Sequence, residues 1–161
     1  MNTRPKIRPQ KNVWDRVLEA IAIGALVYGV VVVLQAWSTL PDTIPTHFDA
    51  SGNADGFGPK GMIWLLPSIS VVLVPAMLIL RRFPWLSNVP IEITEENAEK
   101  QYGLIVRLLS LLACAVSLLF TALVYDTILI AGGGNSLLGA WFMPIFLTGN
   151  MAPILWYFYA A

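Results

Sequence analysis

Four long stretches of this 161-residue chain contain no charged side chain, or only one or two near an end. They run over Val17 to Trp37, Gly61 to Leu80, Leu104 to Ile130 and Ser136 to the C-terminus. Because about twenty helical residues cross the hydrocarbon core of a bilayer, each stretch is long enough to span it. The pattern predicts transmembrane helices over about 14–37, 61–80, 95–130 and 136–159, with an outer loop at 38–60 and a cytoplasmic connection at 81–101.

Composition supports a membrane location, because 57% of the residues are hydrophobic and only 12% are charged. Soluble domains carry about 25% charged residues. Aromatic residues suited to the membrane interface lie toward the ends of the apolar stretches: Trp14, Trp37, Trp64, Trp85, Trp141, Trp156, Tyr157 and Tyr159. We therefore expect residues 1–161 to form one all-α domain, a four-helix bundle in contact with the lipid bilayer, rather than a soluble helical bundle.

The distribution of lysine and arginine predicts the orientation in the membrane. Basic residues gather between Arg4 and Arg16 and around the second connection, whereas the first and third connections contain only Lys60. The positive-inside rule then places both termini in the cytoplasm and the first connection outside. The apolar run that follows the basic tail is too long for a cleaved secretory signal, so we expect no cleavage.

The outer loop contains the most distinctive sequence of the chain, LPDTIPTHFDASGNADGFGPK, which includes the single histidine. Proline restricts the backbone to extended conformations, and glycine beside Asn or Asp is typical of turns, with the Asp55–Gly56 pair as the strongest turn signal. A simple tether needs neither feature, so the loop is predicted to be a shaped surface. The residues expected to shape it are Pro41, Pro45, Gly52, Gly56 and Gly58.

Side chains at the outer end of the bundle are candidates for ligand binding or sensing. Histidine can change charge near neutral pH, aromatic rings suit an apolar ligand, and carboxylates attract a cationic amphiphile. The candidates are His47, Phe48, Asp49, Asp55, Phe57, Lys60 and Asp126, the last near the outer end of the third helix as a floor for the loop. The alternatives are that His47 only orders its loop through hydrogen bonds and that Asp126 is a solvated carboxylate at a helix end.

Several kinds of site are excluded by the residues present. Asp49 begins an alternation that resembles an EF-hand, but Ala54 and Lys60 stand where that motif needs glycine and glutamate. A single histidine and the mid-helix Cys114 make a poor transition-metal site, and His47 has no evident nucleophile partner. We therefore expect no enzyme activity, no metal and no cofactor. Nucleic-acid binding is also not expected, because the basic tail is explained by topology.

Two predictions concern the interior of the bundle. Glu19 and Arg107 both lie near the cytoplasmic ends of their helices, so we expect them to face each other as an intramembrane ion pair or to snorkel at that boundary. Small residues recur four apart, as in Ala25 with Gly29 and in Ala113, Ser117 and Thr121. Such rows let helices approach closely in lipid, and packing within this bundle is the expected use.

The outer loop also resembles a domain of unknown function found at the start of SdpI-type bacterial immunity proteins. The resemblance covers about Leu26 to Leu80 and rests on a leucine-proline, an isoleucine-proline-x-histidine and a glycine-rich loop. In this chain those elements are Leu40 and Pro41, then Ile44, Pro45 and His47, and finally Gly52, Asp55, Gly56, Gly58 and Lys60. SdpI-type proteins are multi-spanning membrane proteins that protect a bacterium from a secreted peptide toxin and can signal its presence.

The resemblance and the loop together predict a toxin-immunity or envelope-stress sensor protein that uses the outer loop as its binding surface. The expected partner is a peptide toxin or another membrane protein. Two alternatives remain open. In a small transporter or channel subunit, the helix prolines and Asn150 would line a path. In a purely structural membrane partner, the loop would matter for folding alone.

Overall fold

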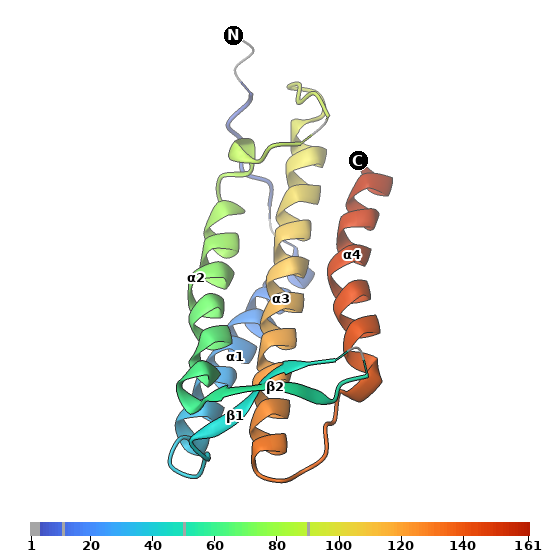
Figure 1. The fold of residues 1–161 in the computed structure, drawn as a ribbon. Helices are drawn as coiled ribbons and strands as arrows, with labels where there is room; N and C mark the ends of the chain where they lie inside the picture. The colour runs from blue at the N-terminus through green and yellow to red at the C-terminus, as the bar shows by residue number, and fades with distance from the viewer. Residues whose placement is uncertain (1–3, 11, 50, 90) are drawn as a thin grey trace.

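The structure is a computed structural model that describes residues 4–10, 12–49, 51–89 and 91–161. Its main helices are α1 (Val13–Ala36), α2 (Leu65–Leu80), α3 (Ala98–Ala131) and α4 (Phe142–Ala160) (Figure 1). Short 3-10 helices occur at η1 (Lys60–Trp64), η2 (Pro84–Leu86) and η3 (Gly139–Trp141), and two strands at β1 (Thr43–Phe48) and β2 (Ala54–Pro59). The fold is thus mostly helical, with a small sheet where the sequence predicts only an ordered loop.

Helix α3 is the centre of the bundle, because α1, α2 and α4 all pack against it. Its 34 residues give a length of roughly 51 Å, more than the roughly 30 Å of hydrocarbon in a bilayer. Among the described residues, three segments are long and apolar enough to cross a membrane: α1, η1 with α2, and α3. Helix α4 is not among them.

Local capping explains where the first and third helices begin. At α1, Asp15 N donates to Asn12 Oδ1 at 2.9 Å and Asn12 N donates to Asp15 Oδ2 at 3.0 Å, which forms a capping box. Before α3, Thr94 N donates to Asn97 Oδ1 at 2.9 Å, so these residues form a turn. The helix begins at Ala98, three residues after the predicted start at position 95.

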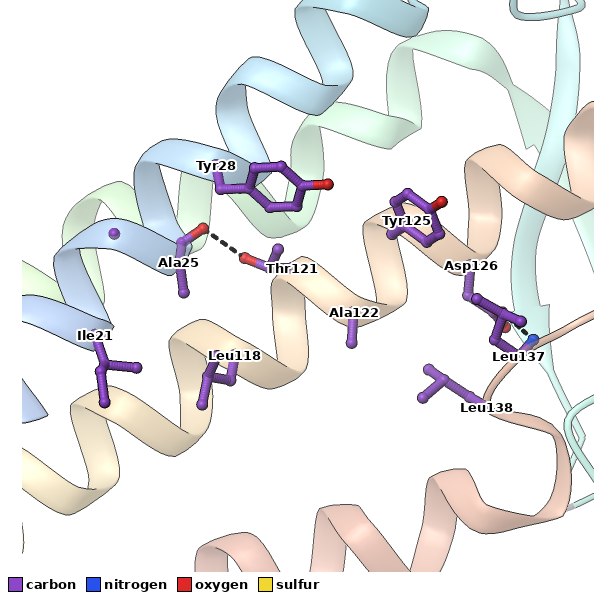
Figure 2. A pocket seen from close by; sticks show the side chains of 11 residues that line it. Ile21, Ala25, Tyr28, Leu118, Thr121, Ala122, Tyr125, Asp126, Leu137 and Leu138 are labelled. Atoms are coloured by element: carbon purple, nitrogen blue, oxygen red, sulfur yellow. Dashed lines mark hydrogen bonds between the residues drawn. The ribbon is translucent and has the colours of Figure 1, made fainter.

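Small and hydroxylated residues hold α3 against α1, as the spacing of small residues predicts. Ser117 Oγ donates to the carbonyl oxygen of Ala22 at 2.7 Å, and Thr121 Oγ1 donates to that of Ala25 at 2.8 Å (Figure 2). A Cβ atom on Gly29 would lie 2.8 Å from Thr121 Oγ1. The close approach of the two helices therefore requires glycine at this position.

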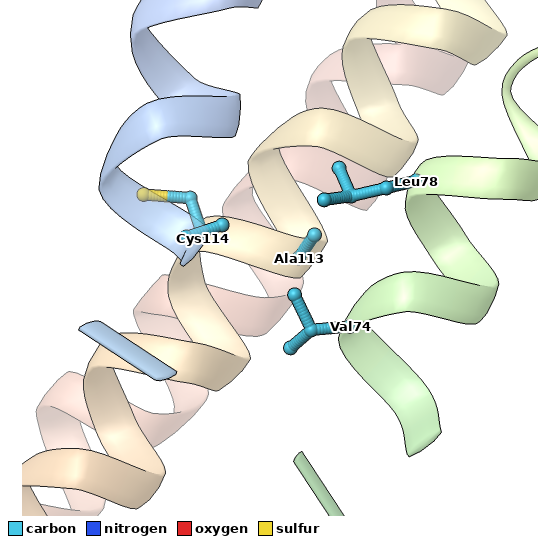
Figure 3. Packing of buried hydrophobic residues seen from close by; sticks show 5 residues of the cluster. Val74, Leu78, Ala113 and Cys114 are labelled. Atoms are coloured by element: carbon cyan, nitrogen blue, oxygen red, sulfur yellow. The ribbon is translucent and has the colours of Figure 1, made fainter. Parts of the chain in front are cut away.

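A hydrophobic cluster joins α2 and α3 near the middle of the bundle. Val74 and Leu78 point from α2 toward Ala113 of α3, and Cys114 lies beside them (Figure 3). Ala22 of α1 completes the cluster, which is almost fully buried. Cys114 is a free, buried cysteine and thus serves as a small apolar residue in packing, as expected from its sequence context.

The ion pairs inside the bundle differ from the predicted one. Glu19 forms an ion pair with Arg81, whose side chain is fully buried, and Arg81 Nη1 also donates to Ser110 Oγ at 2.8 Å. Arg107 Nε instead lies 3.3 Å from Asp15 Oδ1. The prediction that Glu19 and Arg107 are partners is therefore corrected: the rotation of the helices brings an arginine from the end of α2 to Glu19.

The described N-terminal segment before α1 and the C-terminus lie at the same end of the bundle, opposite the sheet and the α3–α4 connection (Figure 1). The basic tail is attached there, since Arg4 Nη1 donates to the carbonyl oxygen of Ser87 at 2.6 Å and Tyr102 Oη donates to that of Pro5 at 2.9 Å. Lys11, which belongs to the predicted basic tail, lies outside the described residues.

Candidate functional site: the hairpin and the cavity beneath it

The predicted outer loop is an antiparallel β-hairpin. Strand β1 pairs with β2 from Thr43 opposite Pro59 to Phe48 opposite Ala54, with irregular register on both sides of His47. Bulges of this kind twist a strand and redirect its side chains. The hairpin lies across α3 near the end of the bundle, and β1 is the strand that contacts the helix.

The turn of the hairpin lies at Asp49 to Asn53, so the prediction of a turn at Asp55 and Gly56 is wrong. Asp49 Oδ1 accepts the backbone N–H groups of Ser51 and Asn53, each at 2.8 Å. The backbone N–H of Asn53 and then its side-chain amide are the main causes that lower the pKa of Asp49 below its ordinary value of 3.8. Asp49 therefore shapes the turn, and its carboxylate is already engaged in hydrogen bonds within the turn.

Gly56 has a different role from the predicted one. It lies opposite His47 in the ladder, and a Cβ atom at this position would lie 2.8 Å from His47 Cβ. Likewise, a Cβ atom on Gly58 would lie 3.1 Å from Thr46 Cγ2. The two glycines thus make room for the side chains of β1 rather than turning the chain.

Apolar residues attach the hairpin to the bundle. Ile44 is 1% exposed and joins Val33, Leu40, Ile63 and Val124 in one buried cluster. Pro45 is buried as well, whereas Pro41 is exposed. The burial of Ile44 and of Leu40 explains why the hairpin has a defined position instead of extending freely from the membrane.

His47 and Asp55 form the central polar contact of the hairpin. His47 Nδ1 lies 2.5 Å from Asp55 Oδ1, and the side chains are 72% and 47% exposed. The contact therefore joins the two strands of the hairpin, and both side chains remain accessible to solvent. Both groups were predicted as candidates, and the sheet brings them together although eight positions separate them.

A cavity of about 300 Å³ lies beneath β1. Residues 44–48 of β1, including His47 and Phe48, line it from the hairpin, and the other walls come from η1, α2, α3 and Phe142 at the start of α4. Its lining is mostly apolar: Ile44, Pro45, Thr46, Met62, Ile63, Leu65, Leu66, Leu123, Val124 and Thr127. The residues from α2, α3 and α4 were missed by sequence reasoning, because an apolar side chain that faces a cavity has the same sequence pattern as one that faces lipid.

Phe57 and Lys60 lie away from this cavity. Phe57 is 63% exposed on β2. Lys60 Nζ lies 3.7 Å from Asp42 Oδ1 and 5.2 Å from the centre of the Trp37 ring, a cation–π arrangement. Lys60 therefore links the base of the hairpin to the end of α1. Neither Asp42 nor Trp37 was singled out by the sequence as its partner.

Asp126 is buried, at 4% exposure, and is bound within the α3–α4 connection. Its carboxylate accepts Ser136 Oγ–H at 2.7 Å and the backbone N–H of Leu137 at 2.6 Å. Ser136 Oγ in turn accepts the N–H of Gly139 at 2.8 Å. The alternative of a solvated carboxylate is therefore wrong, and Asp126 orders the connection next to the hairpin turn.

The described residues contain no group of three or more His, Cys, Asp or Glu side chains that could hold a metal ion. The transport alternative required Asn150 to face a path. Its side-chain amide donates to the carbonyl oxygen of Phe146 at 2.8 Å, one turn earlier in α4. This hydrogen bond satisfies one N–H of the Asn150 side-chain amide within α4 itself.

Residues 20–71 match the family described as "Domain of unknown function (DUF1648)". The match includes most of α1, the whole hairpin and the first turns of α2. An uncharacterized protein from Archaeoglobus fulgidus is 34% identical over 65 residues, an alignment that covers 35% of this chain and 36% of that protein. The chain therefore spans about a third of that relative's length. No solved structure matches the chain.

Proposed function

We propose that this membrane protein recognises a membrane-active peptide at its outer hairpin and thereby protects the cell or signals envelope stress. The observation that carries the proposal is the exposed His47–Asp55 pair on the hairpin, in which His47 also lines an apolar cavity of about 300 Å³. The DUF1648 match over residues 20–71 and the resemblance to the loop of SdpI-type immunity proteins support it.

The chemistry of the surface suits a cationic amphipathic peptide. Asp42 is 98% exposed and Asp55 is 47% exposed, so the hairpin presents carboxylates to the solvent. An apolar side chain of the peptide would enter the cavity beside Phe48 while its cationic groups meet these carboxylates. The proposal assigns no catalytic step to any residue.

In the proposed orientation, α4 is a fourth crossing and both termini lie in the cytoplasm of the inner membrane. Exposed basic residues at the end that carries the termini support this orientation, including Arg16, Arg82 and Lys100. The hairpin would then face the compartment from which a secreted peptide arrives. Accessibility of single cysteines introduced at Ser51 and at Glu96 to an impermeant maleimide tests the orientation, since only the first should react in intact cells.

Survival of cells under challenge with secreted membrane-active peptides tests the function. The arms are no protein, wild type, the double variant His47→Ala with Asp55→Ala, and a control with Glu95→Ala and Glu96→Ala at the opposite end. At matched membrane abundance, we expect protection by the wild type and the control, and loss of protection in the hairpin variant. Equal survival in all arms contradicts the proposal.

Ion flux into liposomes that contain purified protein tests the transport alternative. The proposal predicts no flux above that of empty liposomes. Flux that is lost when Asn150 is replaced by Leu, with unchanged survival under peptide challenge, would favour a transporter or channel subunit instead.

A further inference from the structure

The outer surface of α1 and α3 contains a second, larger hollow, an open groove of about 640 Å³. Its walls are side chains of both helices, from Ile21 and Leu118 at one end to Leu137 and Leu138 of the α3–α4 connection at the other (Figure 2). The groove exists because small residues form part of its lining: a Cβ atom on Gly24 would have nothing within 4 Å. It is separate from the cavity beneath the hairpin.

Apart from the hydroxyl groups of Tyr28 and Tyr125, the polar side chains that line the groove are already bonded. Thr121 Oγ1 donates to the carbonyl oxygen of Ala25, and Asp126 accepts hydrogen bonds from Ser136 and Leu137. The groove therefore offers little to water or to a polar ligand along most of its length. Its occupant must be apolar where it meets α1 and α3.

Two tyrosines give the groove a direction. Tyr28 and Tyr125 line its half nearest the α3–α4 connection, and they are 53% and 42% exposed. Tyrosine prefers the level of the membrane at which one end of the side chain is apolar and the other is polar. An occupant with a polar head next to the connection and an apolar tail toward Ile21 matches this direction.

The extent of the groove suits a flexible occupant. Its lining on α1 runs from Ile21 to Tyr28, roughly 10 Å of helix, and it continues to Leu137 and Leu138 of the α3–α4 connection. A flexible acyl chain can follow this floor from the helices to the connection.

We infer that this groove is a binding site for one acyl chain of a phospholipid from the leaflet on the hairpin's side. Both walls belong to segments that are long and apolar enough to span a membrane, so hydrocarbon is the medium that surrounds the opening. The bound acyl chain fills the space that the small residues of α1 and α3 leave between the two helices. This inference does not depend on whether the hairpin binds a peptide.

Photo-crosslinking tests the site. The full-length protein is reconstituted into phosphatidylcholine vesicles that contain a trace of phosphatidylcholine with a diazirine on one acyl chain, and labelled peptides are mapped after irradiation. Label is expected to concentrate on α1 and α3 around Gly24 and Ala122, relative to exposed lipid-facing residues of α2 such as Val72. Equal labelling of these surfaces overturns the inference.

Filling the groove provides the matched comparison. Gly24→Leu with Ala122→Leu should abolish the concentrated label. Gly149→Leu adds the same side chain at another glycine whose Cβ position has nothing within 4 Å, but on α4, and should leave the label unchanged. A filled variant that folds and is still labelled like the wild type overturns the inference. A crosslink between two protein molecules across the groove, in place of the lipid label, also overturns it.

Thermal unfolding in detergent gives a second readout that does not require the label. Added phosphatidylcholine should raise the unfolding temperature of the wild type and of Gly149→Leu, because a ligand that binds the folded state stabilises it. The filled variant should show a smaller rise. The same rise in all three proteins would indicate general solvation by lipid and contradict a specific site.

Discussion

Gly52 in the hairpin turn lies directly against the backbone of Gly139 in the α3–α4 connection. A Cβ atom on Gly52 would lie 2.5 Å from the carbonyl carbon of Gly139, and Gly52 has a φ of 81°. The position thus requires glycine for two independent reasons, the close contact and the left-handed backbone. Through this contact, the turn held by Asp49 meets the connection held by Asp126.

Replacing Gly52 by alanine should destabilise the protein by about 2–4 kcal/mol, because the left-handed backbone costs about 1 kcal/mol and overpacking adds about 1–3 kcal/mol. Thermal unfolding in detergent measures the effect. Gly61→Ala is the control, since a Cβ atom there would have nothing within 4 Å. If both variants were as stable as the wild type, the hairpin turn would not be packed on the connection.

The His47–Asp55 pair should contribute little to stability although it is central to the proposed recognition. Both side chains are largely exposed, and exposed ion pairs contribute about 0–1 kcal/mol. A double-mutant cycle with His47→Ala and Asp55→Ala, measured by unfolding, should therefore give a small coupling energy. A coupling above about 2 kcal/mol would identify the pair as mainly structural and weaken the proposed function.

Asp49 should make the hairpin sensitive to acid. Hydrogen bonds from Asn53 lower the pKa of Asp49 in the folded state, so its ionised form stabilises the fold above the ordinary value of 3.8. This stabilisation is lost as the pH falls through the lowered pKa.

The comparison between about pH 5 and about pH 3 should show a smaller decrease in unfolding temperature for Asp49→Asn than for the wild type. Asparagine keeps an oxygen acceptor for the turn but does not titrate. Asp42→Asn serves as the control, since Asp42 is 98% exposed. An identical pH response of the wild type and Asp49→Asn would contradict the role of the Asp49 carboxylate.

The Glu19–Arg81 pair should behave as a buried interaction. Replacing Glu19 by leucine leaves a fully buried guanidinium without this partner and should cost about 3–5 kcal/mol, whereas Glu19→Leu with Arg81→Met should recover part of the loss. Unfolding of the two variants measures the difference.

Arg107→Met provides the contrast, because the Arg107 side chain is 38% exposed and pairs with Asp15. Its effect should be smaller than that of Glu19→Leu and should add to it. Strong non-additivity between Glu19 and Arg107 would instead support the pairing that the sequence suggests.

The sequence by itself determined the helices, because their signals are local. Uncharged runs of spanning length mark them, and α1 begins within one residue of its predicted start. The motif from Leu40 to Lys60 also indicates a shaped surface, since proline and glycine restrict or free the backbone at their own positions. These inferences needed no knowledge of distant neighbours, and the helical part of the fold agrees with them to within a few residues, except at the start of α4.

Only the tertiary structure decided how these elements use their residues. Gly56 resembles a turn residue in sequence, but cross-strand pairing makes it the space for His47. Glu19 meets Arg81 because partner choice depends on the rotation and depth of packed helices, which charge spacing does not encode. The cavity and the groove both combine segments far apart in the chain, and lipid-facing and cavity-facing side chains have the same apolar pattern until packing separates them.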